Sequence, residues 1–466
     1  MTTRYDHATV IAHRHDVPVV LDDHSITIDG GFIREVRPTG EVVTTPNPGQ
    51  ACPGLSPDKT IGPFEVIDAS KYLVIPGLVN THHHLYQSLT RGLKSVQNAG
   101  LFDWLRALYE KWRTIDYEAV RTASQISLAE LLLSGCTTTS DHFYIFPKGS
   151  GVRLEAVLEA AESLGMRIHA CRGSMSVGAS KGGLPPDDCT EDEADILADS
   201  RRVLEAFHDR SVGSMRRIDL APCSPFSVSA ELSRDTAALA REHGALLHTH
   251  AAETLDEKRY CVERFGMGPI DWLCELGWLG SDVYLAHGVH LSDGDIDRIA
   301  RTHTGVAHCP CSNMRLGSGT PPIRALLARG ARVGLGVDGS SSNDGGHLLA
   351  EARQALLMAR LAGGAEAMTV AQAFTLPTMG SAAVLNRPEL GNVAPGFAAD
   401  LAFYRRDDVA LAGAVEQDPL GAMILCHVAR ADRVVIAGRT VVEEGRITSV
   451  ELEPLVERFN ALVRRW

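Results

Sequence analysis

The sequence predicts an α/β protein whose main part is a (β/α)8 TIM-like barrel. Eight short runs of apolar or β-branched residues between Lys71 and Gly339 alternate with amphipathic stretches of helical period, as in repeated βα units. Histidine and aspartate residues stand at the C-terminal ends of several runs. A barrel brings those ends to one mouth, whereas the alternative, an open doubly wound sheet, would hold the first and eighth runs far apart.

The eight predicted strands follow one another at regular intervals along the chain. They begin at Leu73, Cys136, Met166, Ile218, Ala245, Val283, Gly305 and Arg332. Helices are predicted between them, for example over residues 153–165, 231–244 and 322–330, where a glycine ends each helical pattern as a C-terminal cap would. This alternation assigns most of the middle of the chain to one barrel.

Composition is typical of a water-soluble globular protein. Apolar residues make up 44% and charged residues 22% of the 466 residues, no apolar run reaches membrane-spanning length, and the first residues lack a targeting pattern. The net charge of −13 and the lack of a basic block argue against a nucleic acid polymer or a membrane as partner, whereas a small heterocycle remains compatible. Ten cysteines without paired spacing are typical of reduced thiols, so we predict a cytoplasmic location.

His82 and His84 stand one residue apart at the end of the first run. Side chains alternate along a strand, so both imidazoles face one side and can bind one ion, although a chance histidine run explains this pair equally well. His250, His287 and Asp338 end the fifth, sixth and eighth runs and add ligand types at the same barrel mouth. Their joint position predicts a metal site.

Glu253 follows His250 by three residues in HTHAAE. Metal-assisted hydrolysis needs a carboxylate that moves protons without binding the ion, and Glu253 is placed for that task. A structural glutamate at a helix start is the alternative for this motif alone. Asp338 can hold both the ion and the attacking water, and His287 can stabilise charge on a heterocyclic substrate. We therefore predict Glu253, His287 and Asp338 as catalytic residues.

Several segments resemble the amidohydrolase superfamily, in its branch of aminohydrolases and deaminases. They are VIPGLVNTHHHLYQSLTRG, HTHAAET, LAHGVHL, GVDGSSSNDGG and NVAPGFAADLAFY. Within that branch the chain is most similar to the group that acts on 8-oxoguanine, and the likeness runs through most of the chain. The resemblance implies a hydrolytic deaminase that converts 8-oxoguanine to urate and ammonia. Isoxanthopterin and hydroxylated aminotriazines are the alternative substrates, and a catalytically dead barrel kept as a scaffold is the alternative from another class.

The resemblance also implies a cofactor and a role for each matching residue. It implies one Zn²⁺ per chain, with Fe²⁺ as the alternative ion, held by His82, His84, His250 and Asp338. The fourth run has no lysine to bridge two metals, which favours a single ion. Glu253 would be the proton shuttle, and His287 would assist at the water and the substrate. Many relatives carry a histidine where Cys223 stands, so a substrate contact of that histidine is not carried over.

Three further residues are predicted to bind the substrate. Gln87 lies three residues after His84 and offers both a donor and an acceptor to a lactam edge. Arg172 has fixed donors that suit ring carbonyl oxygens. Trp104 can stack on a flat ring, although it shares one helical face with Leu101 and other large apolar residues, so that core packing explains it equally well.

Both ends of the chain together form one small β-sandwich domain if the resemblance holds. The flanks contain strand-like stretches such as HSITIDGGFIREV and RVVIAGRTVVEEGRI, and the Pro/Gly-rich segment 44–63 is typical of a surface loop. We expect the sandwich over residues 1–73 and 393–466, and the metal-dependent barrel over residues 74–392. The sequence leaves open whether the chain forms a homo-oligomer.

Overall fold

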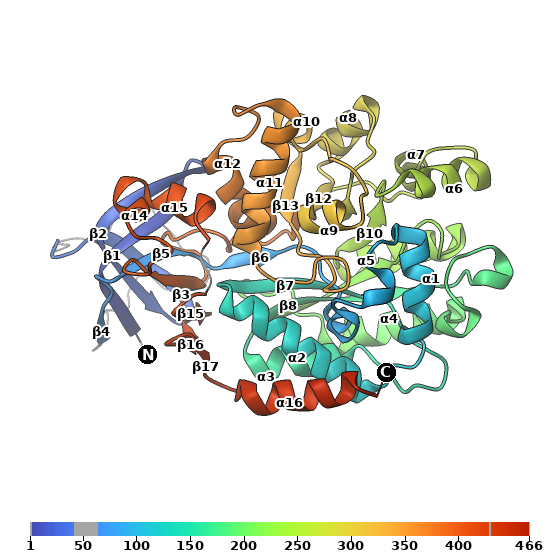
Figure 1. Cartoon of the computed structure of the whole chain (residues 1–466), viewed down its shortest axis with the longest axis horizontal. Helices are drawn as coiled ribbons and strands as arrows, with labels where there is room; N and C mark the ends of the chain where they lie inside the picture. Colours follow the sequence, from blue (N-terminus) through green and yellow to red (C-terminus); the bar gives the residue numbers. More distant parts are fainter. Residues whose placement is uncertain (1, 42–63, 428–429, 466) are drawn as a thin grey trace.

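The computed structural model describes residues 2–41, 64–427 and 430–465. Its barrel sheet has eight parallel strands in the order β13-β12-β11-β10-β9-β8-β7-β6, so each strand neighbours the next one along the chain. They are β6 (Leu78–Asn80), β7 (Cys136–Phe143), β8 (Arg167–Ser174), β9 (Arg216–Pro222), β10 (Leu247–Ala251), β11 (Val283–His287), β12 (Gly305–His308) and β13 (Arg332–Leu335). The predicted order of eight barrel strands is confirmed (Figure 1).

The barrel closes between its first and last strands just beyond their ends. The Thr81 N–H donates to the Leu335 carbonyl at 2.8 Å, and the Asp338 N–H donates to the His82 carbonyl at 3.0 Å. These bonds join the chain that follows β6 to the last residue of β13 and to the chain that follows β13. Because these two segments carry His82 and Asp338, closing the barrel also brings their side chains together.

The first predicted run is two strands in the structure. Tyr72–Pro76 forms β5, which pairs with strands of a second sheet, and only Leu78–Asn80 joins the barrel as β6. Gly77 separates them: its N–H donates to the Asp400 carbonyl, and a Cβ at this position would overlap the Thr137 side chain. The sequence hides the break because both strands are buried throughout, so the apolar run continues across it.

Helices cover the outside of the barrel, and α16 lies along α2 (Figure 1). The longer helices are α1 (Leu101–Trp112), α2 (Tyr117–Leu133), α3 (Glu155–Leu164), α4 (Glu193–Phe207), α5 (Ala230–His243), α6 (Leu255–Phe265), α8 (Asp293–Thr302), α11 (Leu348–Gly363) and α16 (Leu452–Val463). The shorter ones are α7 (Pro269–Glu275), α9 (Pro310–Arg315), α10 (Ile323–Ala328), α12 (Val370–Thr375), α13 (Ser381–Val384), α14 (Ala414–Gln417) and α15 (Pro419–Leu425). Short 3-10 segments are η1 (Leu85–Thr90), η2 (Lys94–Val96), η3 (Ala179–Lys181) and η4 (Asp187–Cys189), and η5 (Leu376–Gly380) is a short π-helical segment.

The structure shows why two of the predicted helices end where they do. Gly165 and Gly244 follow α3 and α5 with φ values of 66° and 63°, the left-handed conformation in which glycine commonly ends a helix. Among the described helices, none combines the length and the apolar content that crossing a membrane requires.

Both ends of the chain build the second, mixed sheet, which stands beside the barrel (Figure 1). Its strand order is β17-β16-β15-β14-β5-β1-β2-β3, with β4 paired to β1. The strands are β1 (Thr2–Arg14), β2 (Val17–Asp29), β3 (Phe32–Pro38), β4 (Phe64–Asp68), β5, β14 (Leu401–Arg405), β15 (Arg433–Ile436), β16 (Arg439–Glu443) and β17 (Arg446–Ile447). A parallel barrel with a separate terminal sheet confirms the predicted fold class, while the loop predicted over 44–63 lies outside the described residues.

A buried ion pair joins the mixed sheet to the barrel. Arg167 at the start of β8 is 0% exposed, and its guanidinium donates to both carboxylate oxygens of Asp400, at 3.2 and 3.0 Å. The same Asp400 carboxylate accepts from the Ala437 N–H at 2.8 Å. One side chain next to β14 therefore binds the first residue of a barrel strand and the turn between β15 and β16.

Candidate metal centre and active site

The four predicted ligand side chains meet at the C-terminal end of the barrel. His82 and His84 follow β6, His250 lies on β10, and Asp338 follows β13. His84 Nε2 lies 3.1 Å from His250 Nε2, and Asp338 Oδ1 lies 3.3 Å from both His82 Nε2 and His84 Nε2. Strands that are distant in sequence thus present three imidazole nitrogens and one carboxylate oxygen to the same point.

Hydrogen bonds at the far side of each ring decide which nitrogen carries the hydrogen. His84 Nδ1 lies 2.7 Å from the carbonyl oxygen of His142, and His250 Nδ1 lies 2.7 Å from that of Cys223. A carbonyl oxygen only accepts hydrogen bonds, so both Nδ1 atoms are donors. The Nε2 atoms of His84 and His250 therefore face each other with lone pairs.

His82 also presents a lone pair at Nε2, because its Nδ1 atom donates to the neighbouring ring of His248. His248 Nδ1 donates to the Tyr284 carbonyl at 2.8 Å, which leaves His248 Nε2 as an acceptor. His82 Nδ1 donates to that acceptor at 2.8 Å. His82 Nε2 is then also a lone pair, and it is buried with no hydrogen-bond partner among the described residues.

This donor set fits a divalent metal ion. Three imidazole lone pairs and a carboxylate oxygen repel one another in a buried site unless a cation lies among them. Bonds of about 2.0–2.1 Å in a tetrahedral zinc site place ligand atoms roughly 3.3 Å apart. The separations of 3.1 and 3.3 Å in this centre match that spacing.

Asp338 is fixed by its own loop and by α9. Its Oδ2 atom accepts from the Ser312 hydroxyl at 2.5 Å and the Ser342 hydroxyl at 3.1 Å, and its Oδ1 atom accepts from the Gly339 N–H at 2.7 Å. The carboxylate is therefore held in one orientation, with Oδ1 toward the imidazoles of His82 and His84.

His142, at the end of β7, is a residue that our sequence reasoning missed. One group of potential ligand atoms within 4.8 Å of one another comprises His82, His142 and His250, and a second comprises His82, His287 and Asp338. His142 Nε2 donates to the Ala221 carbonyl at 3.0 Å, so its buried Nδ1 atom is a lone pair without a described partner. Its position at a strand end was the signal that could have identified it.

Glu253 and His287 form a buried pair next to the metal centre. Glu253 Oε2 lies 3.6 Å from His287 Nε2, and His287 Nδ1 donates to the Asn313 amide oxygen at 3.0 Å, which turns Nε2 toward the carboxylate. Burial raises the pKa of Glu253 to about 7. Burial alone would lower the pKa of His287, but the carboxylates of Glu253 and Asp338 outweigh it and raise that pKa. A carboxyl group that titrates near neutrality can both accept and donate a proton.

A small cavity adjoins this pair, and the Glu253 and His287 side chains both line it. Gln87 and Trp104 both line it, with Tyr109 and Phe226 adding further aromatic surface. The Gln87 side-chain oxygen is buried without a described partner, so it is available to a ligand. Trp104 also donates from Nε1 to the Ser341 carbonyl at 3.2 Å, so it serves the packing of the wall as well.

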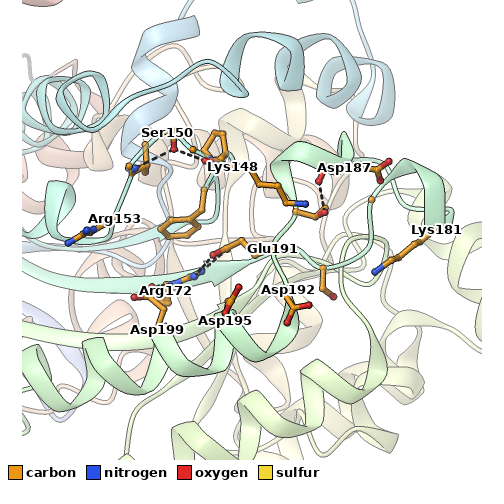
Figure 2. Close-up of a pocket in the computed structure, with 18 of the residues that line it drawn as sticks. Lys148, Ser150, Arg153, Arg172, Lys181, Asp187, Glu191, Asp192, Asp195 and Asp199 are labelled. Carbon is orange, nitrogen blue, oxygen red and sulfur yellow. Dashed lines mark hydrogen bonds and ion pairs between the residues drawn. The ribbon is translucent and has the colours of Figure 1, made fainter.

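Arg172 is the predicted substrate residue that the structure does not bring to this cavity. Figure 2 shows its guanidinium between Glu191 and Asp199 in a separate, strongly charged pocket. It donates to Glu191 at 2.7 Å, to Asp199 at 2.7 Å and to the Gly173 carbonyl, and it stacks on the Phe146 ring. With its donors bound to these carboxylates, Arg172 ties the end of β8 to α4, outside the cavity that Gln87 and Trp104 line.

A barrel that carries such a histidine and aspartate site at its C-terminal face defines a metal-dependent hydrolase. A model of the amidohydrolase family matches residues 73–441, and the chain belongs to that family. Its histidine and aspartate centre supports a divalent metal.

The chain is similar to two deaminases and to one triazine enzyme of known structure. The chain is 48% identical over 394 residues to 8-oxoguanine deaminase from Pseudomonas aeruginosa, covering 84% of this chain and 87% of the relative. It is 36% identical over 418 residues to isoxanthopterin deaminase from an unknown prokaryotic organism, covering 86% of each. A solved structure of atrazine chlorohydrolase from Arthrobacter aurescens TC1, complexed with zinc, superposes with a TM-score of 0.90 at 32% identity, covering 99% of this chain and 100% of that one.

Proposed function

We propose that this enzyme hydrolytically deaminates 8-oxoguanine to urate and ammonia. Water adds to the ring carbon that bears the amino group, a carbon–oxygen bond forms, and the carbon–nitrogen bond to the amino group breaks. The observation that carries the proposal is the 48% identity to 8-oxoguanine deaminase over most of both chains. The cavity beside the histidine centre supports it, because its aromatic lining suits a flat heterocycle.

We propose that His82, His84, His250 and Asp338 hold a single divalent ion, with zinc expected first and Fe²⁺ as the alternative. The lone-pair arrangement of these four side chains and their tetrahedral spacing support this assignment. When bound, such an ion lowers the pKa of water and polarises the carbon under attack.

The protein groups around the centre then have distinct tasks. Glu253 takes a proton from the attacking water and delivers it to the leaving amino nitrogen, which its burial and its pKa of about 7 support. His287 stabilises charge that develops on the ring, and Gln87 pairs with a lactam edge of the substrate through its free side-chain oxygen and its amide N–H.

The test is a comparison of kcat/KM for 8-oxoguanine, guanine, isoxanthopterin and a hydroxylated aminotriazine with protein whose metal content has been measured. We expect 8-oxoguanine to lead and guanine to be poorer by up to about 10⁴-fold, because a site that pairs the 8-oxo edge leaves buried polar groups unmatched with guanine. Urate absorbance and ammonia release report turnover, and metal analysis should give one ion per chain.

Other results of that comparison have defined meanings. Faster turnover of isoxanthopterin would keep the deaminase but change the substrate, and hydrolysis of triazines alone would favour the chemistry of the structural neighbour. No turnover of any of them would support the dead scaffold. A cytoplasmic location is part of the proposal, and the nine cysteines in the described ranges, all free thiols, support it.

A further inference from the structure

Glu257 is a buried carboxylate that the proposed chemistry does not use. It is 1% exposed and lies in the first turn of α6, the helix that follows the strand carrying His250. Its Oε1 atom accepts from the Ala252 N–H and its Oε2 atom accepts from the Glu253 N–H, both at 2.8 Å. Each carboxylate oxygen thus holds one peptide N–H of the turn that presents Glu253.

This arrangement differs from ordinary helix capping in the same chain. At the start of α8, Asp295 occupies the same third helical position and accepts from the N–H of the cap residue Ser292 itself. At the start of α6 the cap residue is Thr254, whose hydroxyl accepts from the Glu257 N–H. The Glu257 side chain passes over Thr254 and binds the two residues before it.

The turn needs such support because its backbone is strained. Ala252 has a φ of 55°, a left-handed conformation that costs a non-glycine residue roughly 1–2 kcal/mol. Its carbonyl accepts from the Val289 N–H at 2.9 Å and the His290 N–H at 2.8 Å. The peptide groups around Glu253 are therefore fixed on one side by the chain after β11 and on the other side by Glu257.

We propose that Glu257 is a positioning residue for the proton shuttle: its two carboxylate oxygens hold the Ala252–Glu253 turn so that the Glu253 side chain stays beside His287 in the cavity. This inference rests on the proposed role of Glu253. A positioning residue acts on the geometry of the reacting groups, so its loss lowers kcat and leaves metal binding and KM nearly unchanged.

The experiment compares Glu257→Gln with Thr254→Ala, a matched control that removes a capping bond from the same helix without touching the N–H groups of the turn. Glutamine places an amide N–H against one backbone N–H, so that contact is lost. We expect kcat to fall about 10- to 100-fold in Glu257→Gln, with KM within about threefold and metal content unchanged. In Thr254→Ala we expect lower thermal stability and kcat within about twofold.

A double-mutant cycle with Glu253→Gln shows whether Glu257 acts through Glu253. In the Glu253→Gln background, Glu257→Gln should lower kcat by less than about twofold. An undiminished effect there, an equal loss of kcat in Thr254→Ala, or loss of the metal would overturn the inference. If Glu257→Gln does not fold, Glu257→Asp, which keeps both acceptors on a shorter side chain, provides the same comparison. If Glu253→Gln by itself keeps full turnover, the proposed shuttle role of Glu253 is wrong. Failure of the shuttle and failure of the positioning inference are therefore measured on different variants.

Discussion

Three residues of the site adopt a backbone conformation that favours glycine. Ala252, His287 and Asp338 have φ values of 55°, 74° and 61°, and each lies at or just beyond the end of a barrel strand. Such conformations cost on the order of 1–3 kcal/mol each and persist where neighbouring contacts fix them. They turn the chain sharply as it leaves the barrel, so that side chains near each turn lie over the mouth.

Among single residues, Glu253 should determine how turnover depends on pH. As the base, Glu253 must be ionised, so kcat/KM should fall as pH decreases through its pKa, which burial raises to about 7 and which the charge of a bound ion lowers. Glu253→Gln should lower kcat about 10²- to 10⁴-fold and should abolish this acidic limb. Rates measured on both sides of neutrality, with metal content checked at each pH, test this. If Glu253→Gln keeps the acidic limb, the fall of kcat/KM at low pH is caused by loss of the metal and not by protonation of Glu253.

Residue types and strand-end positions were enough to predict the four side chains that meet at the metal centre, but not the direction in which the Arg172 side chain points. In β8, His169 and Cys171 contact Asp219 and Tyr284 inside the barrel. Side chains alternate along a strand, so Arg172 must point outward, toward α4. The same period applied to HTH would have shown that His248 faces inward with His250. The partners in each case come from other segments of the chain, which one sequence does not reveal.

At the scale of elements, the loop after β13 packs against η1, and Gly339 of this loop faces the Gln87 side chain. A Cβ on Gly339 would collide with the side-chain oxygen of Gln87, the group proposed to pair with the substrate. Gly339→Ala should therefore displace this carboxamide and raise KM about 3- to 10-fold, the value of one neutral hydrogen bond, with metal content unchanged. Gly345→Ala is the matched control, since a Cβ there meets nothing within 4 Å. Equal KM values in the two variants would contradict a contact between the Gln87 side chain and the substrate.

Element boundaries were harder to predict than element order. The alternation of apolar runs and helical stretches was enough to order all eight barrel strands, because each unit repeats the same pattern. The division of one apolar run into β5 and β6 was not predictable, because it depends on contacts of Gly77 with Thr137 and Asp400, which lie on other segments. Likewise, only the structure shows that β5, which ends at Pro76, belongs to the terminal sheet.

For the whole molecule, the pair formed by Arg167 and Asp400 predicts how the two sheets support each other. Removing one partner of a buried ion pair leaves the other charge unpaired and costs about 3–5 kcal/mol. Asp400→Asn should therefore lower the free energy of unfolding by roughly that amount, measured by urea denaturation. Glu242→Gln breaks the exposed pair with Arg201 and should cost less than about 1 kcal/mol. Equal effects of the two variants would contradict a structural role for the buried pair.

The position of β5 between β1 and β14 also has a consequence for biosynthesis. During translation β1, β2 and β5 are synthesised early, but β14 begins only at Leu401, after the entire barrel has been translated. At ordinary elongation rates this interval is on the order of tens of seconds, during which one edge of β5 has no strand to pair with. The nascent chain must keep this apolar edge from associating with other chains until translation reaches β14, so a truncated product that stops after the barrel should aggregate rather than remain as a free-standing barrel.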